Sequence, residues 1–462
     1  MIIDDVLDEA LRLYKPSQEE ERYLMDLANT IIHQAKECSI NYNGILKITL
    51  EGSLAKKTWI RGREEVDIFI HHDSKILREE MEKQIIEIGF KILKELDGRP
   101  RLMYADHPYV EGRIRNVVVN IVACYDVTPP NWLSATDRTP YHTKYIIEKM
   151  KPEVRDHVRL MKAFMAACRV YGAEIKVRGF SGYLAELLLL NYGDFNNTIR
   201  AISKWKPPIV IDIERHYDSV DELFKLFPNQ PLIVVDPVDK YRNVASAVSE
   251  KRLCELILAS KLFCESPSIK FFKPKTPAVK ISKFRRKMLR RRFVGIVFRI
   301  SKWKPPDVLW GELRKSEEAV KKTLERLGFE IYRSDSWTDE EKICIILCEI
   351  SNNRLPYARL HRGPPVYHPN SLEFIKKWKD NPEREAGPWI DDSRLYVLRV
   401  EPIVDVKKLL KKEIEEGRVS LAKGLTEDIK KGEIITSIEN LIKNRNLRSF
   451  INEFVEANLP FI

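Results

Sequence analysis

The stretch LEGSLAKKTWIRGREEVDIFI (residues 50–70) joins two predicted strands through a glycine–serine turn. Gly52 lets the backbone come close to a phosphate, because glycine has no side chain in the way. The short helical segment that follows has free N–H groups at its start, which favour an anion. The Ser53 hydroxyl and the Lys56 ammonium add two further contacts for phosphate oxygens. This half of the stretch therefore indicates a phosphate-binding turn.

The second half of the stretch places two acids on a strand. Glu65 and Asp67 are separated by one residue, so both carboxylates face the same side of that strand. Two such carboxylates can hold Mg²⁺ beside a triphosphate. The ordinary alternative is a surface loop followed by an edge strand with two exposed acids. Either half alone favours that alternative, whereas both halves at this spacing favour a nucleotide site.

The rest of the chain divides into three parts by pattern. Residues 1–130 alternate helix and strand signals, and the apolar run 117–125 predicts a buried strand. Residues 131–265 are mostly helical in pattern. Residues 266–462 begin with a proline-rich segment and continue as strands and helices, with helices expected over 405–457. The expected fold is therefore α+β and multidomain.

Hydrophobic periodicity gives the other expected elements. Strands are expected at 45–50, 66–70, 293–300, 328–333, 342–350 and 394–401, and helices at 78–97, 308–326 and 371–379. One further helix is expected to carry Arg155, Arg159, Lys162 and Arg169 on one face, because they fall at i, i+4, i+7 and i+14. Without other context, the ordinary interpretation of such a stripe is a solvated charged face.

Composition excludes two classes of protein. Of the 462 residues, 44% are hydrophobic, which is too many for a disordered chain. No apolar run approaches the roughly 20 residues that a membrane span needs. The start MIIDDVLDEALRLY has acids among its apolar residues and no basic segment, so an amphipathic helix is expected there rather than a signal peptide. The seven cysteines form no CxxC pair, which favours reduced thiols and a cytoplasmic protein.

Several blocks of the sequence resemble one known family. The glycine–serine turn and the alternating acids resemble the nucleotidyltransferase superfamily, and further blocks are similar to those of the archaeal, class I CCA-adding enzymes. These blocks keep the family's order over most of the chain and are HPYVEG (107–112), VNIVACYDV (119–127), SATDRTPYHTKYI (134–146), VRGFSGYLAELLLLNYGDF (177–195), DPVDKYRNVASAVS (236–249) and GPPVYHPNSLEFIKKW (363–378).

This resemblance implies a fold and an activity. The activity is the template-independent addition of C, C and A to the 3′ end of tRNA from CTP and ATP, with Mg²⁺ as the cofactor. The implied domains are a nucleotidyltransferase head (1–130), a helical neck (131–265), and an RRM-like or ferredoxin-like body with a helical tail (266–462). The expected partner is the tRNA acceptor arm, an A-form stem recognised mostly through phosphates and 2′-hydroxyls. Members of the family are typically dimers, so a homodimer is also expected.

The matching blocks imply roles for individual residues. Glu65 and Asp67 match the family's first two catalytic metal ligands, and Asn120 stands at the position of the third. Arg242 matches the arginine that reads the incoming base, since its planar fork of donors can meet acceptors on C or A. The residues expected around the nucleotide are Gly52, Ser53, Lys56, His107, Thr139, His142, Lys162 and Tyr171. Taken singly, each of these residues is better explained as an ordinary loop or core position, whereas within the matched blocks the role at the nucleotide is favoured.

Asn120 is a departure from the family pattern, which has an aspartate there. Val118 and Val122 share its strand face, Asp126 lies about 20 Å further along an extended strand, and Glu111 lies outside the strand. An amide oxygen can ligate Mg²⁺ but adds no charge. An introduced substitution, a natural paralogue with lost or changed activity, and a lineage with a weaker site all explain Asn120. Asn120→Asp is expected to raise nucleotide incorporation strongly and leave nucleotide affinity nearly unchanged.

Two other functions remain open at this point. A tRNA-binding protein without catalysis would keep the fold as a clamp, and a nucleotidyltransferase that adds only A would use the same scaffold. Incubation with tRNA ending before CCA, Mg²⁺, and labelled CTP and ATP separates the three. The match around Arg242 argues against a preference for ATP alone.

One short segment is equivalent to the whole excess of positive charge. Lys and Arg number 79 against 68 Asp and Glu, a net charge of +11, and residues 270–292 hold 11 basic residues and no acid. A disordered basic linker is the alternative, but interleaved apolar residues favour an ordered tRNA contact. Neutralising its last three arginines is expected to weaken tRNA binding and flatten its salt dependence. The proposed RNA-binding residues are Lys283, Arg285, Arg286, Lys287, Arg290, Arg291 and Arg292.

Overall fold

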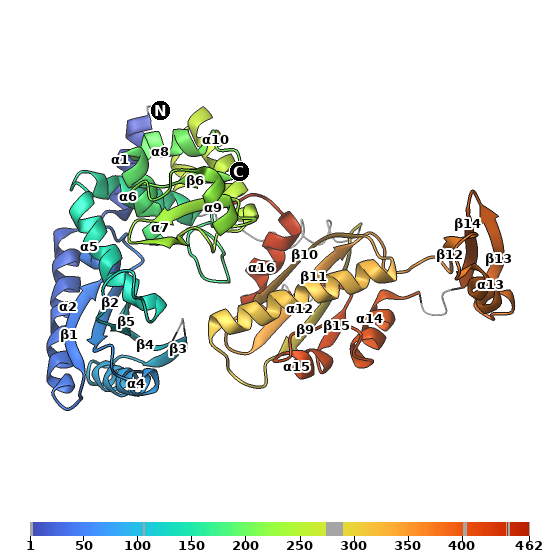
Figure 1. The fold of residues 1–462 in the computed structure, drawn as a ribbon, viewed down its shortest axis with the longest axis horizontal. Coiled ribbons are helices and arrows are strands. Elements are labelled where there is room, and N and C mark those ends of the chain that lie inside the picture. Colours follow the sequence, from blue (N-terminus) through green and yellow to red (C-terminus); the bar gives the residue numbers. More distant parts are fainter. Residues whose placement is uncertain are drawn as a thin grey trace. The chain divides into compact units, whose positions relative to one another are not determined.

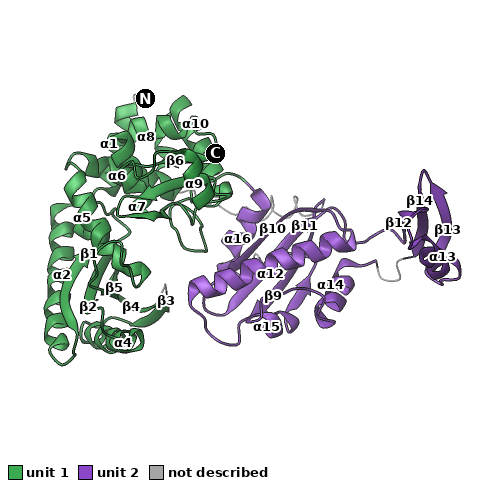
Figure 2. Cartoon of the chain, viewed as in Figure 1, with its two compact units in different colours: residues 1–276, 458–462 green, residues 277–457 purple. Residues whose placement is uncertain are grey.

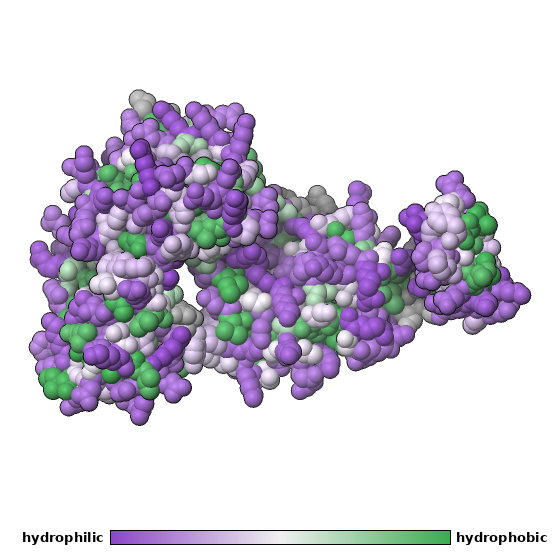
Figure 3. All heavy atoms as spheres, in the orientation of Figure 1, coloured by the Kyte–Doolittle hydropathy of each residue, from purple (hydrophilic) through white to green (hydrophobic). Residues whose placement is uncertain are grey.

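The computed structural model describes residues 3–104, 107–273, 290–400, 404–439, 441 and 444–461, and it divides the chain into two compact units (Figure 2). Unit 1 consists of residues 1–276 and 458–462, and unit 2 consists of residues 277–457. Both units combine helices with strands, so the fold is mixed α+β, as the sequence predicts. In the view of Figure 3, hydrophilic side chains cover most of the visible surface of each unit.

Unit 1 begins with a five-stranded mixed sheet in the order β1-β2-β5-β4-β3 (Figure 1). Strands β2 and β5 are parallel, and the other neighbours are antiparallel. The expected strands at 45–50, 66–70 and 117–125 are confirmed, and the sheet has two more strands that the sequence pattern did not indicate. The bounds are β1 (Ile45–Glu51), β2 (Glu65–His72), β3 (Arg101–Tyr104), β4 (Pro108–Ile114) and β5 (Val117–Tyr125).

Two helices, α2 (Gln18–Ser39) and α4 (Arg78–Glu95), cover one face of this sheet and leave the other face for the polar residues of β2 and β5. The helix α2 begins where the Ser17 side chain accepts from the N–H of Glu20 and the Glu20 carboxylate accepts from the N–H of Ser17, a capping box. The apolar residues of both helices share one core with the inward side chains of the strands. The short helix α3 (Gly52–Ala55) connects β1 to the loop before β2.

The remainder of unit 1 is mainly helical, as expected, with one small sheet of three short strands. A cluster of phenylalanines forms its centre, with Phe164 in ring contact with Phe195, Phe263, Phe271 and Phe272. Phe461, from the C-terminal segment, stacks on Phe271. The helices are α1 (Ile3–Tyr14), η1 (Ala135–Arg138), α5 (Thr139–Lys149), α6 (Val154–Ala167), α7 (Gly182–Tyr192), α8 (Phe195–Ile202), α9 (Val220–Leu226), α10 (Glu250–Glu265) and η2 (Ile269–Phe271), and the strands are β6 (Ile209–Ile211), β7 (Leu232–Asp236) and β8 (Asp239–Asn243).

Unit 2 is built on an antiparallel sheet in the order β10-β11-β9-β15. Apart from one excursion, its elements follow in the order strand, helix, two strands, two helices and strand, which is a split β-α-β arrangement. The expectation of helices alone over 405–457 is wrong at residues 433–435, which pair with β9 as an edge strand. The bounds are β9 (Arg292–Arg299), α12 (Pro306–Leu327), β10 (Ile331–Thr338), β11 (Ile343–Ile350), α14 (Val406–Glu415), α15 (Thr426–Lys430), β15 (Glu433–Ile435) and α16 (Arg445–Glu456).

An excursion between β11 and α14 forms a second sheet in the order β12-β14-β13 with one helix. The helix matches the expected range 371–379. The bounds are β12 (Ala358–Pro365), α13 (Ser371–Lys379), β13 (Arg384–Asp391) and β14 (Arg394–Val400).

The two ends of unit 2 lie side by side. The Arg291 guanidinium donates to the backbone carbonyl of Val455 at 2.7 Å, and the rings of Phe293 and Phe454 are 6.3 Å apart.

Two further features of the described residues concern the cysteines and the helices. All seven cysteines lie there, and none of them is in a disulfide. Among the described helices, none has the length and apolar character that a bilayer crossing requires.

Candidate active site

Glu65, Asp67 and Asn120 lie together on the open face of the large sheet. Asp67 of β2 is directly paired with Asn120 of β5, and Glu65 lies two residues before Asp67 on the same strand. The Asn120 Nδ2 amide donates to Asp67 Oδ1 at 2.8 Å. The sheet thus brings Asp67 and Asn120 into contact and places Glu65 two residues away on the same strand, and the catalytic role of the three residues remains a prediction.

This group fits a divalent cation. Desolvation by the surrounding protein, and then the charge of Asp67, raise the pKa of Glu65 to about 7, although the residue itself stays exposed at the start of the strand. Asn120 Oδ1 is buried without a hydrogen-bond partner among the described residues. Crowded carboxylates and an unpaired amide oxygen are the ligands that Mg²⁺ accepts. No group of three or more His, Cys, Asp or Glu side chains placed to hold a metal ion is found among the described residues; the contact here joins Asp67 and Asn120, with Glu65 two residues away on the same strand.

Gly52 closes this site from the side of β1. Its φ of +72° lies in the left-handed region, and a Cβ at this position would lie 2.0 Å from Asp67 Oδ2. The backbone of the turn therefore packs directly against the carboxylate, which no side chain at position 52 would allow. Ser53, the next residue of α3, is half-buried.

Gly52→Ala is expected to lower the rate of nucleotide incorporation about 100-fold, because the new methyl group displaces Asp67 and a shift near 1 Å has effects of this size. Single-turnover incorporation of labelled CMP measures the effect. Gly62→Ala is the matched control, since Gly62 has a φ of +85° but nothing within 4 Å of the added Cβ. Equal losses in the two variants would show that backbone strain, and not the position of Asp67, is responsible.

Lys56 and Lys162 converge on a buried glutamate that the sequence reasoning missed. Glu186 of α7 is fully buried and accepts from Lys56 Nζ at 2.5 Å and from Lys162 Nζ at 3.0 Å. The Thr58 hydroxyl donates to the same carboxylate at 2.5 Å. Burial alone would raise the pKa of Glu186, but the two ammonium groups lower it to about 2. The signal in the sequence was a single acid inside the apolar helix GYLAELLLL, a residue type that is rarely buried without a partner.

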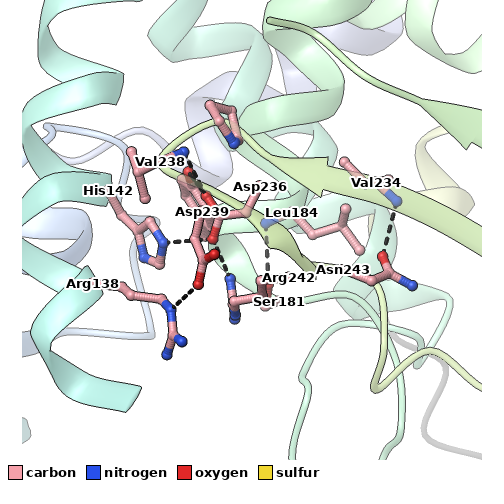
Figure 4. Close-up of polar contacts among 12 residues, drawn as sticks. Arg138, His142, Ser181, Leu184, Val234, Asp236, Val238, Asp239, Arg242 and Asn243 are labelled. Carbon is pink, nitrogen blue, oxygen red and sulfur yellow. Dashed lines mark hydrogen bonds and ion pairs between the residues drawn. The ribbon is translucent and has the colours of Figure 1, made fainter. Parts of the chain in front are cut away.

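A second polar cluster surrounds Asp236 at the end of β7 (Figure 4). The Asp236 carboxylate accepts from Arg242 Nη1 at 2.7 Å and lies 2.8 Å from His142 Nε2. The Tyr183 hydroxyl donates to it at 3.1 Å, and the Tyr183 ring stacks on His142 with centroids 4.1 Å apart. Burial would raise the pKa of Asp236, but His142 and Arg242 lower it to about 2. Two of the predicted nucleotide-binding residues, His142 and Arg242, thus share one carboxylate.

The remaining predicted nucleotide-binding residues have their own contacts. His107 is buried, with Nε2 at 2.8 Å from the Thr136 hydroxyl and Nδ1 at 3.2 Å from a backbone carbonyl. Thr139 is the first residue of α5. Tyr171 lies beneath the guanidinium of Arg63, 4.9 Å from the ring centre, and burial raises its pKa. These contacts do not join the three residues to Asp67, so their roles remain predictions.

The predicted RNA-binding residues divide into three groups. Lys283, Arg285, Arg286 and Lys287 lie outside the described residues. Arg290 and Arg292 are exposed. Arg291 instead forms a bidentate pair with Glu349 at 2.5 and 2.6 Å, and Arg333 contacts the same carboxylate at 2.8 Å. Arg291 is therefore part of the framework of unit 2.

Comparisons with known proteins agree on one family. Residues 156–273 match the family described as tRNA nucleotidyltransferase, second domain, and residues 291–437 match the family described as CCA-adding enzyme, C-terminal domain. The CCA-adding enzyme of Pyrobaculum islandicum is 35% identical over 91% of this chain and 97% of its own length. That of Methanothermobacter thermautotrophicus is 35% identical over 84% and 83%. A solved cytoplasmic RNA terminal U-transferase covers 60% of this chain with a TM-score of 0.47 and 13% identity, a likeness too distant to bear on the argument.

Proposed function

The chain belongs to the CCA-adding enzymes, the tRNA nucleotidyltransferases, and we propose that Glu65, Asp67 and Asn120 form the site where it adds C, C and A to the 3′ end of tRNA. The substrates are tRNA, CTP and ATP. The observation that supports this placement of the site is the pairing of Asp67 with Asn120 beside the Gly52 turn.

In the reaction, the terminal 3′-oxygen of tRNA forms a bond to the α-phosphorus of the nucleotide. The bond from that phosphorus to the bridging oxygen breaks, pyrophosphate leaves, and the hydroxyl proton passes to solvent. Glu65, Asp67 and Asn120 would hold a divalent cation, proposed to be Mg²⁺, which when bound would lower the pKa of the attacking hydroxyl and neutralise charge on pyrophosphate. Glu65 and Asp67 supply negative charge at the reacting centre. The Gly52 turn, which packs against the Asp67 carboxylate, fixes the position of that side chain.

Recognition of the incoming base is proposed for Arg242. Asp236 accepts from one Nη of its guanidinium, which orients the group, and the guanidinium has further N–H donors that a base could use. A side chain held in this way can discriminate among bases by hydrogen bonds at little further cost in side-chain entropy. The stacked pair of His142 and Tyr183 contacts the same carboxylate, His142 at the Oδ2 atom that Arg242 also contacts and Tyr183 at Oδ1.

An incorporation assay tests the function directly. The protein is incubated with tRNA ending before CCA, Mg²⁺, and labelled CTP and ATP, and we expect both CMP and AMP to be added. Incorporation of A alone would indicate the nucleotidyltransferase that adds only A. No incorporation by the chain or by its Asn120→Asp variant would indicate a tRNA-binding protein without catalysis.

The finer domain description is also a proposal. The strand–helix–strand–strand–helix–helix–strand order of unit 2 supports a ferredoxin-like body, and the helices α5–α8 and α10 support a helical neck between the head and that body. A homodimer and a cytoplasmic location remain predictions, the second supported by seven cysteines without a disulfide.

Neutralising Arg290 and Arg292 together to Gln is expected to weaken tRNA binding and to reduce the slope of log K against log salt by about 0.7–0.9 for each phosphate that these side chains neutralise. Arg291 is left intact because it pairs with Glu349 inside unit 2. Filter binding at several salt concentrations measures the slope, and CTP affinity should not change. Lys322→Gln is the control, since it removes an exposed lysine of the same unit. A slope that stays the same would remove these two arginines from the tRNA interface.

A further inference from the structure

A second glutamate lies beside Asn120 on the neighbouring strand. Asn120 of β5 is paired directly with Asp67 on one side and with Glu111 of β4 on the other. Directly paired residues on adjacent strands project to the same face of a sheet. Asp67, Asn120 and Glu111 therefore form one row across the open face, with Asn120 in the middle.

The packing of β4 supports this orientation of Glu111. Its two neighbours, Val110 and Gly112, face α4, because a Cβ on Gly89 of α4 would lie 2.7 Å from Val110 and a Cβ on Gly112 would lie 2.7 Å from Leu93. Alternate residues of a strand point to opposite faces, so Glu111 points away from α4.

Glu111 can also reach the site. Adjacent strands lie about 4.8 Å apart, so the backbone of Glu111 is one strand from Asn120 and two strands from Asp67. A glutamate side chain is one methylene longer than aspartate, and two ions in a two-metal site are themselves about 3.5–4 Å apart.

The amide at position 120 leaves this site short of one negative charge. Asn120 donates its N–H to Asp67 and keeps Oδ1 buried without a partner among the described residues. Glu51, the other acid in the row, lies on the far side of Asp67 from Asn120 and is almost fully buried, so it does not flank the amide. Glu111 is the carboxylate that does.

We propose that Glu111 supplies the carboxylate that Asn120 lacks, and that it holds the divalent cation of the active site together with Asp67. This inference rests on the proposed site. The sequence reasoning set Glu111 aside because it is outside the strand of Asn120, whereas the sheet places it next to that residue. On this basis, Asn120→Asp raises the affinity of the site for the divalent cation only slightly in the intact chain, and strongly when Glu111 is replaced.

Metal binding and turnover in four variants test the inference, with Mn²⁺ as the probe. The variants are Glu111→Gln, Asn120→Asp, the double variant of these two, and Asp67→Asn. Free Mn²⁺ is measured by electron paramagnetic resonance, without nucleotide, and CMP incorporation is measured separately. Glu111→Gln is expected to weaken the tightest Mn²⁺ site about tenfold, and the double variant is expected to return to within twofold of the unmodified chain. Glu79→Gln, in the first turn of α4 on the other face, is the matched control and should have no effect.

The outcomes separate the inference from the proposed function. Mn²⁺ binding that survives Asp67→Asn would reject the proposed site itself. Loss of binding in Asp67→Asn with unchanged binding in Glu111→Gln would reject only the role of Glu111. If Glu111→Gln weakened binding equally in the unmodified chain and in the Asn120→Asp variant, its role would also be rejected, because a general electrostatic effect does not depend on residue 120.

Discussion

Replacing Asp67 by asparagine is expected to lower CMP and AMP incorporation by at least about 10³-fold, because a metal-bound carboxylate stabilises the transition state by several kcal/mol and each 1.4 kcal/mol is a factor of about ten. The change keeps the shape of the side chain, and an asparagine oxygen at position 67 can still accept from the Asn120 amide. The thermal midpoint should therefore stay close to that of the unmodified protein. Single-turnover incorporation with saturating CTP isolates the chemical step.

Asp73→Asn is the matched control for this prediction. Asp73 directly follows β2, and its carboxylate accepts from the backbone N–H of Lys75 rather than facing the row. Its variant should incorporate nucleotide at nearly the unmodified rate. If Asp67→Asn retained more than about a tenth of the activity, Asp67 would not be the residue that holds the metal.

Replacing Glu186 by glutamine is expected to destabilise unit 1 by about 3–5 kcal/mol, because it leaves the ammonium groups of Lys56 and Lys162 buried without their counter-charge. For a unit of this size, each kcal/mol lowers the midpoint by about 2–4 °C, so thermal unfolding followed by circular dichroism resolves the effect. Glu148→Gln, which removes an exposed partner of Lys144, is the control and should cost less than about 0.5 kcal/mol. Similar midpoints for both variants would contradict a structural role for the buried pair.

The lowered pKa of Glu186 also predicts how the free energy of unfolding depends on pH in the acid range. Because the pKa of Glu186 is lowered to about 2 in the folded protein, its stabilising effect is present above its unfolded pKa near 4.5 and is lost as the pH falls from there toward 2. The free energy of unfolding of Glu186→Gln should therefore depend less on pH in this range than that of the unmodified chain. Urea titrations at several pH values check the difference.

The strands that carry the site were predictable because their sequences are nearly continuous apolar runs. Residues 45–50, 66–70 and 117–125 have the β-branched composition of buried strands, and all three appear in the sheet. Strand β4 was missed although Val110, Gly112 and Ile114 alternate toward α4, since proline, glycine and charged residues interrupt the apolar signal. That omission hid the position of Glu111.

Lys162 illustrates a different limit of the sequence. The spacing correctly placed it on a helix face with Arg155 and Arg159, but α6 ends at Ala167, so the prediction was wrong for Arg169. The expected environment for this stripe was solvent. Lys162 is instead buried, because Glu186 from another helix provides the opposite charge. A partner that is distant in the chain leaves no local pattern, so burial of a charged residue cannot be inferred from its own helix.

The way in which unit 1 is assembled from two separate stretches of chain links the stabilities of the two units. Unit 2, residues 277–457, lies in the sequence between the main part of unit 1 and the segment that contains Phe461, so it closes a loop of chain between two parts of unit 1. Closing a flexible loop of that length costs roughly 4–5 kcal/mol in entropy. Folded unit 2 brings the ends of this loop together through Arg291 and Val455, and so removes most of that cost. Unfolding of unit 2 should therefore release Phe461 from the phenylalanine cluster of unit 1, through chain connectivity alone.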